Sequence, residues 1–383
     1  MKIAIIGTRG IPNYYGGFEQ FAEYLAKGLV QRGHDTTVYN SHLHPYQKSE
    51  WNGVKLVHCQ DPEDKWGTVG QFVYDLNCIL DSRKKSFDII LQLGYTSSTI
   101  WGWLLPRKNC VVTTNMDGLE WSRSKYSKPV QWFLRQAEYL ATVFSDHWIS
   151  DSIGIQDYLK KKYNIPSTYI PYGAHPFNSP DENDLKPYDV EKYGYNMLVA
   201  RFEPENNIDT ILEGAAAASV KTPFLVIGKH ATKYGEYLKD KFKSHPHIRF
   251  IGGVYDINVL NNLRYYSNLY FHGHSVGGTN PSLLEAMASQ ALICANQNLF
   301  NSAILEKDAF YFSTVEDVKI TIDKIRREDH SHFVQNNFAK IQKIYEWNNI
   351  IDQYEDHFKL ISKSSAQRKN EILQHNPSGR LPD

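Results

Sequence analysis

Apolar and polar positions alternate in the same way in two halves of the chain. In residues 1–173, short apolar runs with the character of buried strands are separated by segments whose apolar residues follow helical spacing. Strands that alternate with helices favour a parallel sheet covered on both faces. The predicted strands of this half are Lys2–Ile6, Thr36–Tyr39, Val54–His58, Asp88–Gln92, Cys110–Thr113, His147–Ile149 and Thr168–Ile170.

The segment after the first strand carries the clearest helical pattern. Its apolar residues recur at intervals that place them on one stripe of an α-helix, and Gly33 follows as the expected C-terminal end. The stripe consists of Phe18, Phe21, Ala22, Leu25 and Leu29.

The alternation resumes after a polar, proline-bearing stretch at residues 175–193, which we interpret as a linker. The second half, residues 194–346, is therefore predicted to form another doubly wound α/β domain. We expect a last amphipathic helix at about residues 347–362 and a loose polar tail at residues 364–383. The predicted strands of this half are Met197–Ala200, Phe224–Ile227, Ile248–Ile251, Leu269–Phe271, Leu292–Ala295 and Phe310–Phe312.

The length and the charge of the chain exclude some classes of protein. A chain of 383 residues suits two domains, and its 42 basic and 42 acidic residues balance, so nucleic acid is not expected as the main partner. The N-terminus reads as a strand and not as a secretory signal, and no apolar run approaches the roughly 20 residues needed to span a bilayer. We expect a cytoplasmic protein with buried free thiols at Cys59, Cys78, Cys110 and Cys294.

A glycine-containing loop follows the strand at Leu269–Phe271 and leads into a helix with Asn280 as its predicted N-cap and a proline at its first position. Backbone N–H groups and the helix dipole would point to one place there, which suits a diphosphate. Glu285, on the first turns of the helix, could accept hydrogen bonds from a ribose diol. The alternative is a capped helix with a surface glutamate. The residues of the loop assigned to a phosphate donor are His274, Gly277, Gly278, Thr279 and Asn280.

A second candidate phosphate contact is Arg201, which follows the strand at Met197–Ala200. Its guanidinium can donate two parallel hydrogen bonds to a phosphate. Lys229 and Lys233, after the next strand, could add positive charge or could belong to a solvated loop.

The turn after the first strand is also rich in glycine. It does not have the dinucleotide-binding spacing, because Arg9 stands where the second glycine would be, which argues against NAD. Gly16 and Gly17, directly before the first helix, would allow the backbone to approach a phosphate or sugar closely. A glycine-rich surface turn is the alternative.

These segments together resemble the family 4 retaining glycosyltransferases, which have the GT-B fold of two Rossmann-like domains facing across a cleft. The resemblance implies that Glu285 matches the second of two glutamates that the family spaces eight residues apart, the one that contacts the nucleotide ribose. Gly277 stands in place of the first glutamate, which contacts the transferred sugar. The resemblance also implies that Arg201 reaches the donor pyrophosphate, where Asn206 replaces a lysine.

The resemblance extends to the end of the chain. Trp347 and Tyr354 match aromatic positions of the family's last helix, which crosses back to pack on the first domain. The resemblance therefore implies a packing role for these two residues.

The segment after the fifth strand, at the edge where doubly wound domains bind ligands, resembles the bacterial rhamnosyltransferase branch. It reads Asp-Gly-Leu-Glu-Trp-Ser-Arg from Asp117, and Gly-Thr-Arg-Gly-Ile-Pro at the N-terminus completes the resemblance. Asp117 stands where the wider family often has a histidine, and we expect it to orient a donor hydroxyl or the acceptor. We assign the acceptor side to Glu120, Trp121 and Arg123; alternatively, Glu120 and Arg123 pair only with each other.

Aromatic and basic residues interleave between residues 101 and 135, a composition that suits contact with an anionic lipid surface presenting a lipid-linked acceptor. No cofactor or metal is expected, because the chain has no Asp-x-Asp, and only one of its four His-x-His pairs, His330 and His332, has carboxylates beside it.

The sequence thus predicts a retaining, metal-independent transfer of a sugar, with dTDP-rhamnose as the leading donor, to a saccharide acceptor in surface polysaccharide synthesis. Arg201 and the N–H groups of residues 277–280 would stabilise the departing diphosphate. The alternatives are a UDP-hexose-dependent transferase, a nucleotide-sugar epimerase of the same fold and a catalytically inactive nucleotide-sugar-binding protein.

Overall fold

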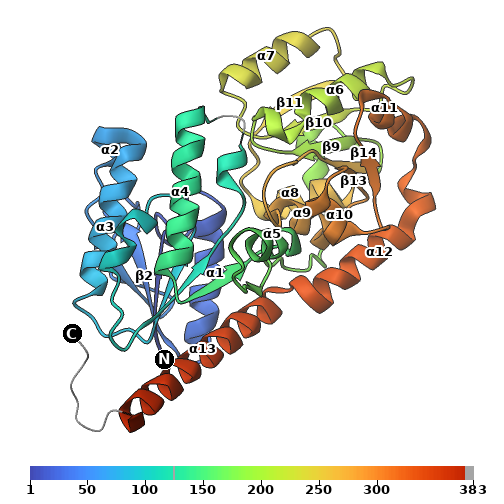
Figure 1. The fold of residues 1–383 in the computed structure, drawn as a ribbon. Helices are drawn as coiled ribbons and strands as arrows, with labels where there is room; N and C mark the ends of the chain where they lie inside the picture. The colour runs from blue at the N-terminus through green and yellow to red at the C-terminus, as the bar shows by residue number, and fades with distance from the viewer. Residues whose placement is uncertain (124–125, 376–383) are drawn as a thin grey trace.

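The computed structural model describes the backbone of residues 1–123 and 126–375 and the side chains up to residue 363. It contains two α/β domains side by side, each built on its own parallel sheet (Figure 1). Two chain segments connect them, and these pair with each other through a bridge between Ala174 and Glu346.

The N-terminal sheet has the order β3-β4-β2-β1-β5-β6-β7-β8, parallel except for β3. Its strands are β1 (Lys2–Ile6), β2 (Asp35–Ser41), β3 (Glu50–Trp51), β4 (Val54–Cys59), β5 (Ile89–Leu93), β6 (Val111–Asn115), β7 (His147–Ser150) and β8 (Thr168–Tyr169). Its helices are α1 (Gly17–Gln31), α2 (Glu63–Trp66), α3 (Gly70–Ser82), α4 (Lys128–Phe144) and α5 (Ile153–Tyr163), with short turns η1 (Gly67–Val69), η2 (Thr99–Leu104) and η3 (Glu120–Ser122).

The C-terminal sheet has the order β11-β10-β9-β12-β13-β14, with all neighbours parallel. Its strands are β9 (Asn196–Val199), β10 (Phe224–Ile227), β11 (Ile248–Gly252), β12 (Leu269–His272), β13 (Ile293–Asn296) and β14 (Phe310–Phe312). Its α-helices are α6 (Ile208–Ala217), α7 (Lys233–Phe242), α8 (Ile257–Tyr265), α9 (Pro281–Ala288), α10 (Leu299–Leu305), α11 (Val315–Lys324) and α12 (Ser331–Lys340). It also has the 3₁₀ helices η4 (Glu182–Tyr188), η5 (Pro204–Asn206) and η6 (Arg327–His330) and the π-helix η7 (Ile341–Tyr345).

Both sheets contain the Rossmann order, in which the chain reverses direction across the sheet beside its first strand: β1 lies between β2 and β5, and β9 lies between β10 and β12. The prediction of two doubly wound domains is therefore confirmed. The sequence analysis missed β3, which pairs antiparallel with β4 through a tight turn at Asn52 and Gly53. Both turn residues have positive φ, 47° and 81°, as an Asn-Gly hairpin turn requires.

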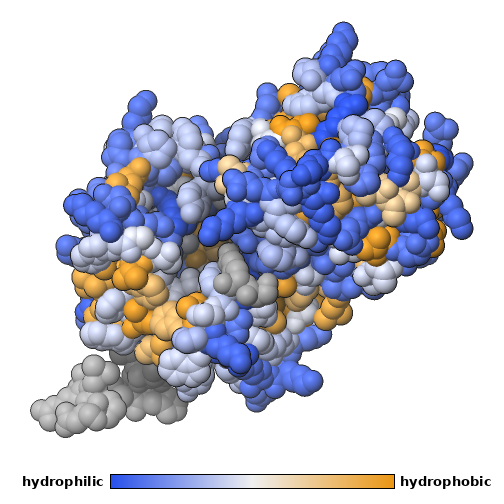
Figure 2. Space-filling view, turned by 90° about the horizontal axis from the view of Figure 1, so that it is seen from above, coloured by the Kyte–Doolittle hydropathy of each residue, from blue (hydrophilic) through white to orange (hydrophobic). Residues whose placement is uncertain are grey.

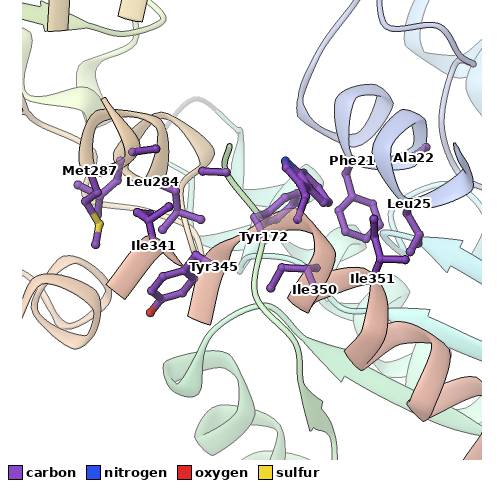
Figure 3. Packing of buried hydrophobic residues seen from close by; sticks show 14 of the residues in the cluster. Phe21, Ala22, Leu25, Tyr172, Leu284, Met287, Ile341, Tyr345, Ile350 and Ile351 are labelled. Carbon is purple, nitrogen blue, oxygen red and sulfur yellow. The ribbon is translucent and has the colours of Figure 1, made fainter. Parts of the chain in front are cut away.

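The last helix, α13 (Trp347–His375), leaves the C-terminal domain and lies along the N-terminal one (Figure 1). Its buried face packs on α1, where Ile351 lies against Gly28 and the rings of Tyr354 and Phe21 are 5.3 Å apart. Figure 3 shows this packing continuing through Tyr172 into the C-terminal domain. One hydrophobic core thus spans the two domains.

The prediction of a loose tail from residue 364 is wrong for residues 364–375, which continue α13. Those residues include good helix formers, and no glycine or proline interrupts the chain before Pro377. Residues 376–383 lie outside the described part of the chain. All four cysteines are free and buried, as predicted. Within the described residues, no helix is both long and apolar enough to cross a membrane.

Candidate functional site

The two domains touch where strands of each sheet end. The turn after β6 lies against the loop after β12, and a Cβ atom added to Gly118 would stand 2.9 Å from the Cα atom of Gly277. Figure 2 shows the domains as two lobes, with hydrophilic residues along much of the line where they meet. The tertiary structure therefore brings the predicted Asp117 segment together with the predicted phosphate loop.

The loop between β12 and α9 has a conformation that favours glycine. Gly277 has φ of 121°, although nothing lies within 4 Å of a Cβ added there. A glutamate at this position would have space but a strained backbone. Where the resemblance places a sugar-contacting glutamate, this chain therefore has a loop shaped for glycine. Asn280 caps α9 by accepting the N–H of Ser282 at 2.9 Å.

Asp151, directly after β7, is a buried residue of the site that the sequence analysis did not select. Its Oδ2 atom accepts the Thr279 N–H at 3.1 Å, and its carbonyl accepts the Thr279 hydroxyl. Burial raises the pKa of Asp151 well above its usual range, and Asp117 raises it further. The N–H group of Thr279, which the sequence analysis expected to donate to a phosphate, therefore donates to the carboxyl group of Asp151 in the other domain.

Arg201 lies exposed in the turn after β9, on the same edge of the sheet as His274. Its carbonyl accepts the Asn206 side-chain amide at 2.7 Å, so Asn206 holds the turn. Burial, together with the charges of Arg201 and Arg123, lowers the pKa of His274 to about 3. The His274 imidazole is therefore neutral near pH 7, and it stacks on the His272 ring with 4.5 Å between centroids.

Asp117, on the turn after β6, brings a titratable carboxyl group close to Arg201. Burial and the charge of Glu120 raise the pKa of Asp117 to about 6, while Arg123 and Arg201 act in the opposite direction. Its N–H donates to the side chain of Asn115 at 3.0 Å. A carboxyl group that titrates close to neutral pH is suited to exchanging a proton with a substrate.

Glu285 faces the boundary between the domains from α9. Its Oε2 atom is 2.7 Å from Nη2 of Arg264, and its Oε1 atom is 3.5 Å from Nε2 of Gln20 on α1. The first turns of α1 therefore lie opposite α9. This contact also places Gly16 and Gly17 at the boundary, and the Gly16 N–H donates to the side chain of Asn13 at 3.2 Å.

The residues assigned to the acceptor side have partners within the N-terminal domain. Glu120 and Arg123 form an ion pair of 2.6 Å, the alternative interpretation that the sequence left open. The Trp121 indole donates to the buried carboxylate of Glu138 at 3.0 Å, and the Arg135 guanidinium lies 4.4 Å above its ring. These contacts fix the loop that carries Asp117.

Lys229 is exposed after β10, and Lys233 is exposed at the start of α7. Within the described residues, no group of three or more His, Cys, Asp and Glu side chains could hold a metal ion.

The sequence analysis did not select three residues of this site, Asp151, Arg264 and Gln20. A signal existed only for Asp151, which comes directly after a predicted strand and so lies at the ligand-binding edge.

Comparisons with known proteins bear on this arrangement. Residues 1–175 match a family described as a domain of unknown function (DUF1972). A protein of Klebsiella pneumoniae, described as an uncharacterized 42.6 kDa protein in the cps region, is 35% identical over 68 residues, which are 18% of each chain.

Solved structures match over nearly the whole chain. Sucrose-phosphate synthase of Thermosynechococcus elongatus superposes with a TM-score of 0.79 at 15% identity, covering 95% of this chain and 99% of the other. HepE of Anabaena in complex with UDP and glucose superposes with a TM-score of 0.73 at 15% identity, covering 94% of this chain and 99% of the other. WaaG, a glycosyltransferase involved in lipopolysaccharide biosynthesis, superposes with a TM-score of 0.69 at 13% identity, covering 94% of this chain and 99% of the other. The chain has the GT-B fold of these glycosyltransferases.

Proposed function

We propose that this protein is a nucleotide-sugar-dependent glycosyltransferase that binds the donor between its two domains. The observation that carries the proposal is that Arg201 and His274 of one domain meet Asp117 of the other. Arg201 lowers the pKa of Asp117 across the boundary, and Arg123, on the loop that follows Asp117, lowers the pKa of His274. A guanidinium and a neutral imidazole can both donate hydrogen bonds to phosphate oxygens. The similarity of fold to HepE, which binds UDP and glucose, supports this class of donor.

In the proposed reaction the bond between the sugar and the diphosphate breaks as the acceptor hydroxyl attacks. Arg201 stabilises the negative charge that accumulates on the departing diphosphate, which is preorganised electrostatic catalysis without a metal ion. Asp117, on the opposite side of the boundary, orients a sugar hydroxyl or the acceptor. In this proposal the bound diphosphate faces two backbone segments. One is the loop before α9, at Gly277, Gly278 and Asn280, and the other is the N-terminal end of α1, at Gly16 and Gly17. Lys229 is a second source of positive charge.

For the substrates we propose dTDP-rhamnose as donor, transfer with retention, and a saccharide acceptor in the synthesis of a surface polysaccharide. The short match to a protein of a cps region supports the polysaccharide context. Gly277, with its positive φ, stands where the resemblance implies a sugar-contacting glutamate, so the sugar in this proposal is held by other contacts.

Calorimetry in EDTA with dTDP, UDP and GDP and their common sugar conjugates tests the donor site. We expect one nucleotide to bind selectively, and Glu285→Gln to weaken its binding about tenfold, or about 1.4 kcal/mol. The matched control is Glu213→Gln, because Glu213 is a glutamate paired with Lys241 far from the boundary. Absence of nucleotide binding, or equal effects of both variants, would contradict the proposal.

The acceptor would be presented at a membrane surface, which we propose contacts α4. The outward face of this helix exposes Trp132, Tyr139 and Val143, and the neighbouring turn η2 exposes Trp103. The exposed charged residues of α4 are both basic, Lys128 and Arg135, because its one acidic residue, Glu138, is buried. Figure 2 shows hydrophobic areas on the N-terminal lobe. Aromatic and basic groups on one face suit an anionic bilayer.

Sedimentation with lipid vesicles tests this surface. The protein is expected to bind vesicles that contain phosphatidylglycerol, and the double variant Trp132→Ser/Tyr139→Ser is expected to bind at least about fivefold more weakly because apolar contact area is lost. Tyr255→Ser, which removes an aromatic ring that is 86% exposed on the C-terminal domain, serves as control. Equal binding to neutral and anionic vesicles would contradict the assignment, as would equal losses in both variants.

A further inference from the structure

A cavity lies at the edge of the N-terminal sheet opposite to the candidate site. It has a volume of about 820 Å³, and it is lined by residues at the start of β1 and by the segments that lead into β5 and β6. The candidate site lies where these strands end, so one strand length, roughly 17 Å, separates it from the cavity. The described residues that line the cavity include none of those assigned to the donor.

Positive charge dominates the lining of this cavity. Five cationic side chains face two carboxylates, which leaves an excess of three positive charges. Both carboxylates already have partners, since Asp35 pairs with Lys55 at 2.7 Å and Asp88 accepts the backbone N–H of Lys2 at 2.7 Å. The cations of the lining are Lys2, Arg83, Lys85, Arg107 and Lys108.

Several of these cations are free to bind an anion. Within the part of the chain that the structure describes, the exposed side chains of Lys2, Arg107 and Lys108 form no ion pair. Arg83 is held in place because its Nη1 atom donates to the carbonyl of Leu104 at 2.9 Å. Ammonium and guanidinium groups form short, charge-assisted hydrogen bonds with phosphate oxygens. The cavity therefore suits a phosphate group.

The cavity adjoins the aromatic surface that we propose contacts the membrane. The turn η2 exposes Trp103, and the same segment continues directly into Arg107 and Lys108. The guanidinium carbon of Arg107 lies 5.9 Å from the ring centre of Phe144, the last residue of α4, and Val143 beside it is exposed. Aromatic groups and unpaired cations thus meet at this end of α4, as suits the boundary between acyl chains and anionic headgroups.

We propose that this cavity binds the phosphate group of an anionic phospholipid and holds the end of α4 at the membrane surface. The inference rests on the proposed membrane contact and names the lipid group that the protein binds. The 17 residues of α4 extend over about 25 Å. Its first turns contact the loop that carries Asp117, where Gln131 donates to the Arg123 carbonyl at 3.3 Å. A lipid bound at one end of α4 therefore keeps the candidate site, at the other end, close to a lipid-linked acceptor.

Sedimentation with phosphatidylglycerol vesicles tests the inference with the double variant Arg107→Gln/Lys108→Gln. We expect this variant to bind about 30-fold more weakly than the wild type, because each cation near an anionic surface contributes about fivefold. The matched control is Lys186→Gln/Lys239→Gln, which removes the same charge from exposed positions of the C-terminal domain and is expected to bind within about twofold of the wild type. Equal binding of the two double variants would contradict the inference.

The same assay separates failure of the inference from failure of the proposed membrane contact. If Trp132→Ser/Tyr139→Ser loses binding and Arg107→Gln/Lys108→Gln does not, the membrane contact stands and the cavity has no part in it. If the wild-type protein binds no vesicles, the membrane contact itself fails.

A soluble phosphate compound is the other source of the same chemistry, and inorganic phosphate is the probe for it. The lipid assignment is wrong if inorganic phosphate raises the melting temperature of the wild type but not of Arg107→Gln/Lys108→Gln, while both bind vesicles equally.

Discussion

Replacing Arg201 by alanine is expected to lower the rate of sugar transfer about 100- to 1,000-fold, the usual effect of removing one preorganised group that stabilises developing negative charge. Asn206 stands where the resemblance implies a second cation, and its buried side-chain amide instead donates to the Arg201 carbonyl. In the proposed reaction, stabilisation of the charge on the departing diphosphate therefore depends mainly on Arg201, with Lys229 as the second source of positive charge.

Release of the nucleoside diphosphate from the donor, measured with the acceptor present, gives the rate. Arg201→Lys keeps the charge but loses the paired donors, so an intermediate loss is expected. Arg83→Ala is the matched control, since Arg83 is an exposed arginine that donates to a backbone carbonyl on the N-terminal domain. If Arg201→Ala and Arg83→Ala show the same activity, Arg201 does not contact the diphosphate.

Replacing Glu138 by alanine is expected to destabilise the protein by about 3 kcal/mol. This carboxylate is 1% exposed, and side chains from two segments, α5 and η3, donate hydrogen bonds to it. Its Oε1 atom accepts from Tyr158 at 2.8 Å, Lys162 at 2.9 Å and Tyr163 at 2.6 Å. Its Oε2 atom accepts from Trp121 at 3.0 Å. Removing the carboxylate leaves these donors without their partner, and each such loss has a cost.

Urea-induced unfolding measures this effect. Glu213→Ala is the control, because that glutamate also pairs with a lysine but its side chain is 42% exposed, and exposed ion pairs contribute about 0–1 kcal/mol. Glu138→Gln, which keeps one acceptor oxygen, is expected to lie between the two. A loss no larger than that of the control would show that Glu138 does not anchor the Trp121 loop.

Much of the architecture followed from local pattern. The strands of both sheets were predicted with small errors at their ends, because short apolar runs separated by amphipathic helices leave few other folds open. Asn280 was predicted as an N-cap from residue types alone, and its side chain does cap α9. The β3 hairpin was missed although its Asn-Gly turn was visible in the sequence. The tail prediction gave too much weight to polarity, since the polar residues 364–375 include good helix formers and contain no glycine or proline.

The sequence by itself thus determined the two Rossmann-like domains and the loops at their ligand-binding edges, because these depend on periodicity and on residue preferences of neighbouring positions. Only the tertiary structure decided the partners of the site residues. Asp151 meets Thr279 across 128 positions, and Gln20 reaches Glu285 across 265. Contacts so distant along the chain depend on how the two domains pack against each other, and a local sequence pattern carries no information about that packing. The state of each charged group depends in turn on those contacts and on burial.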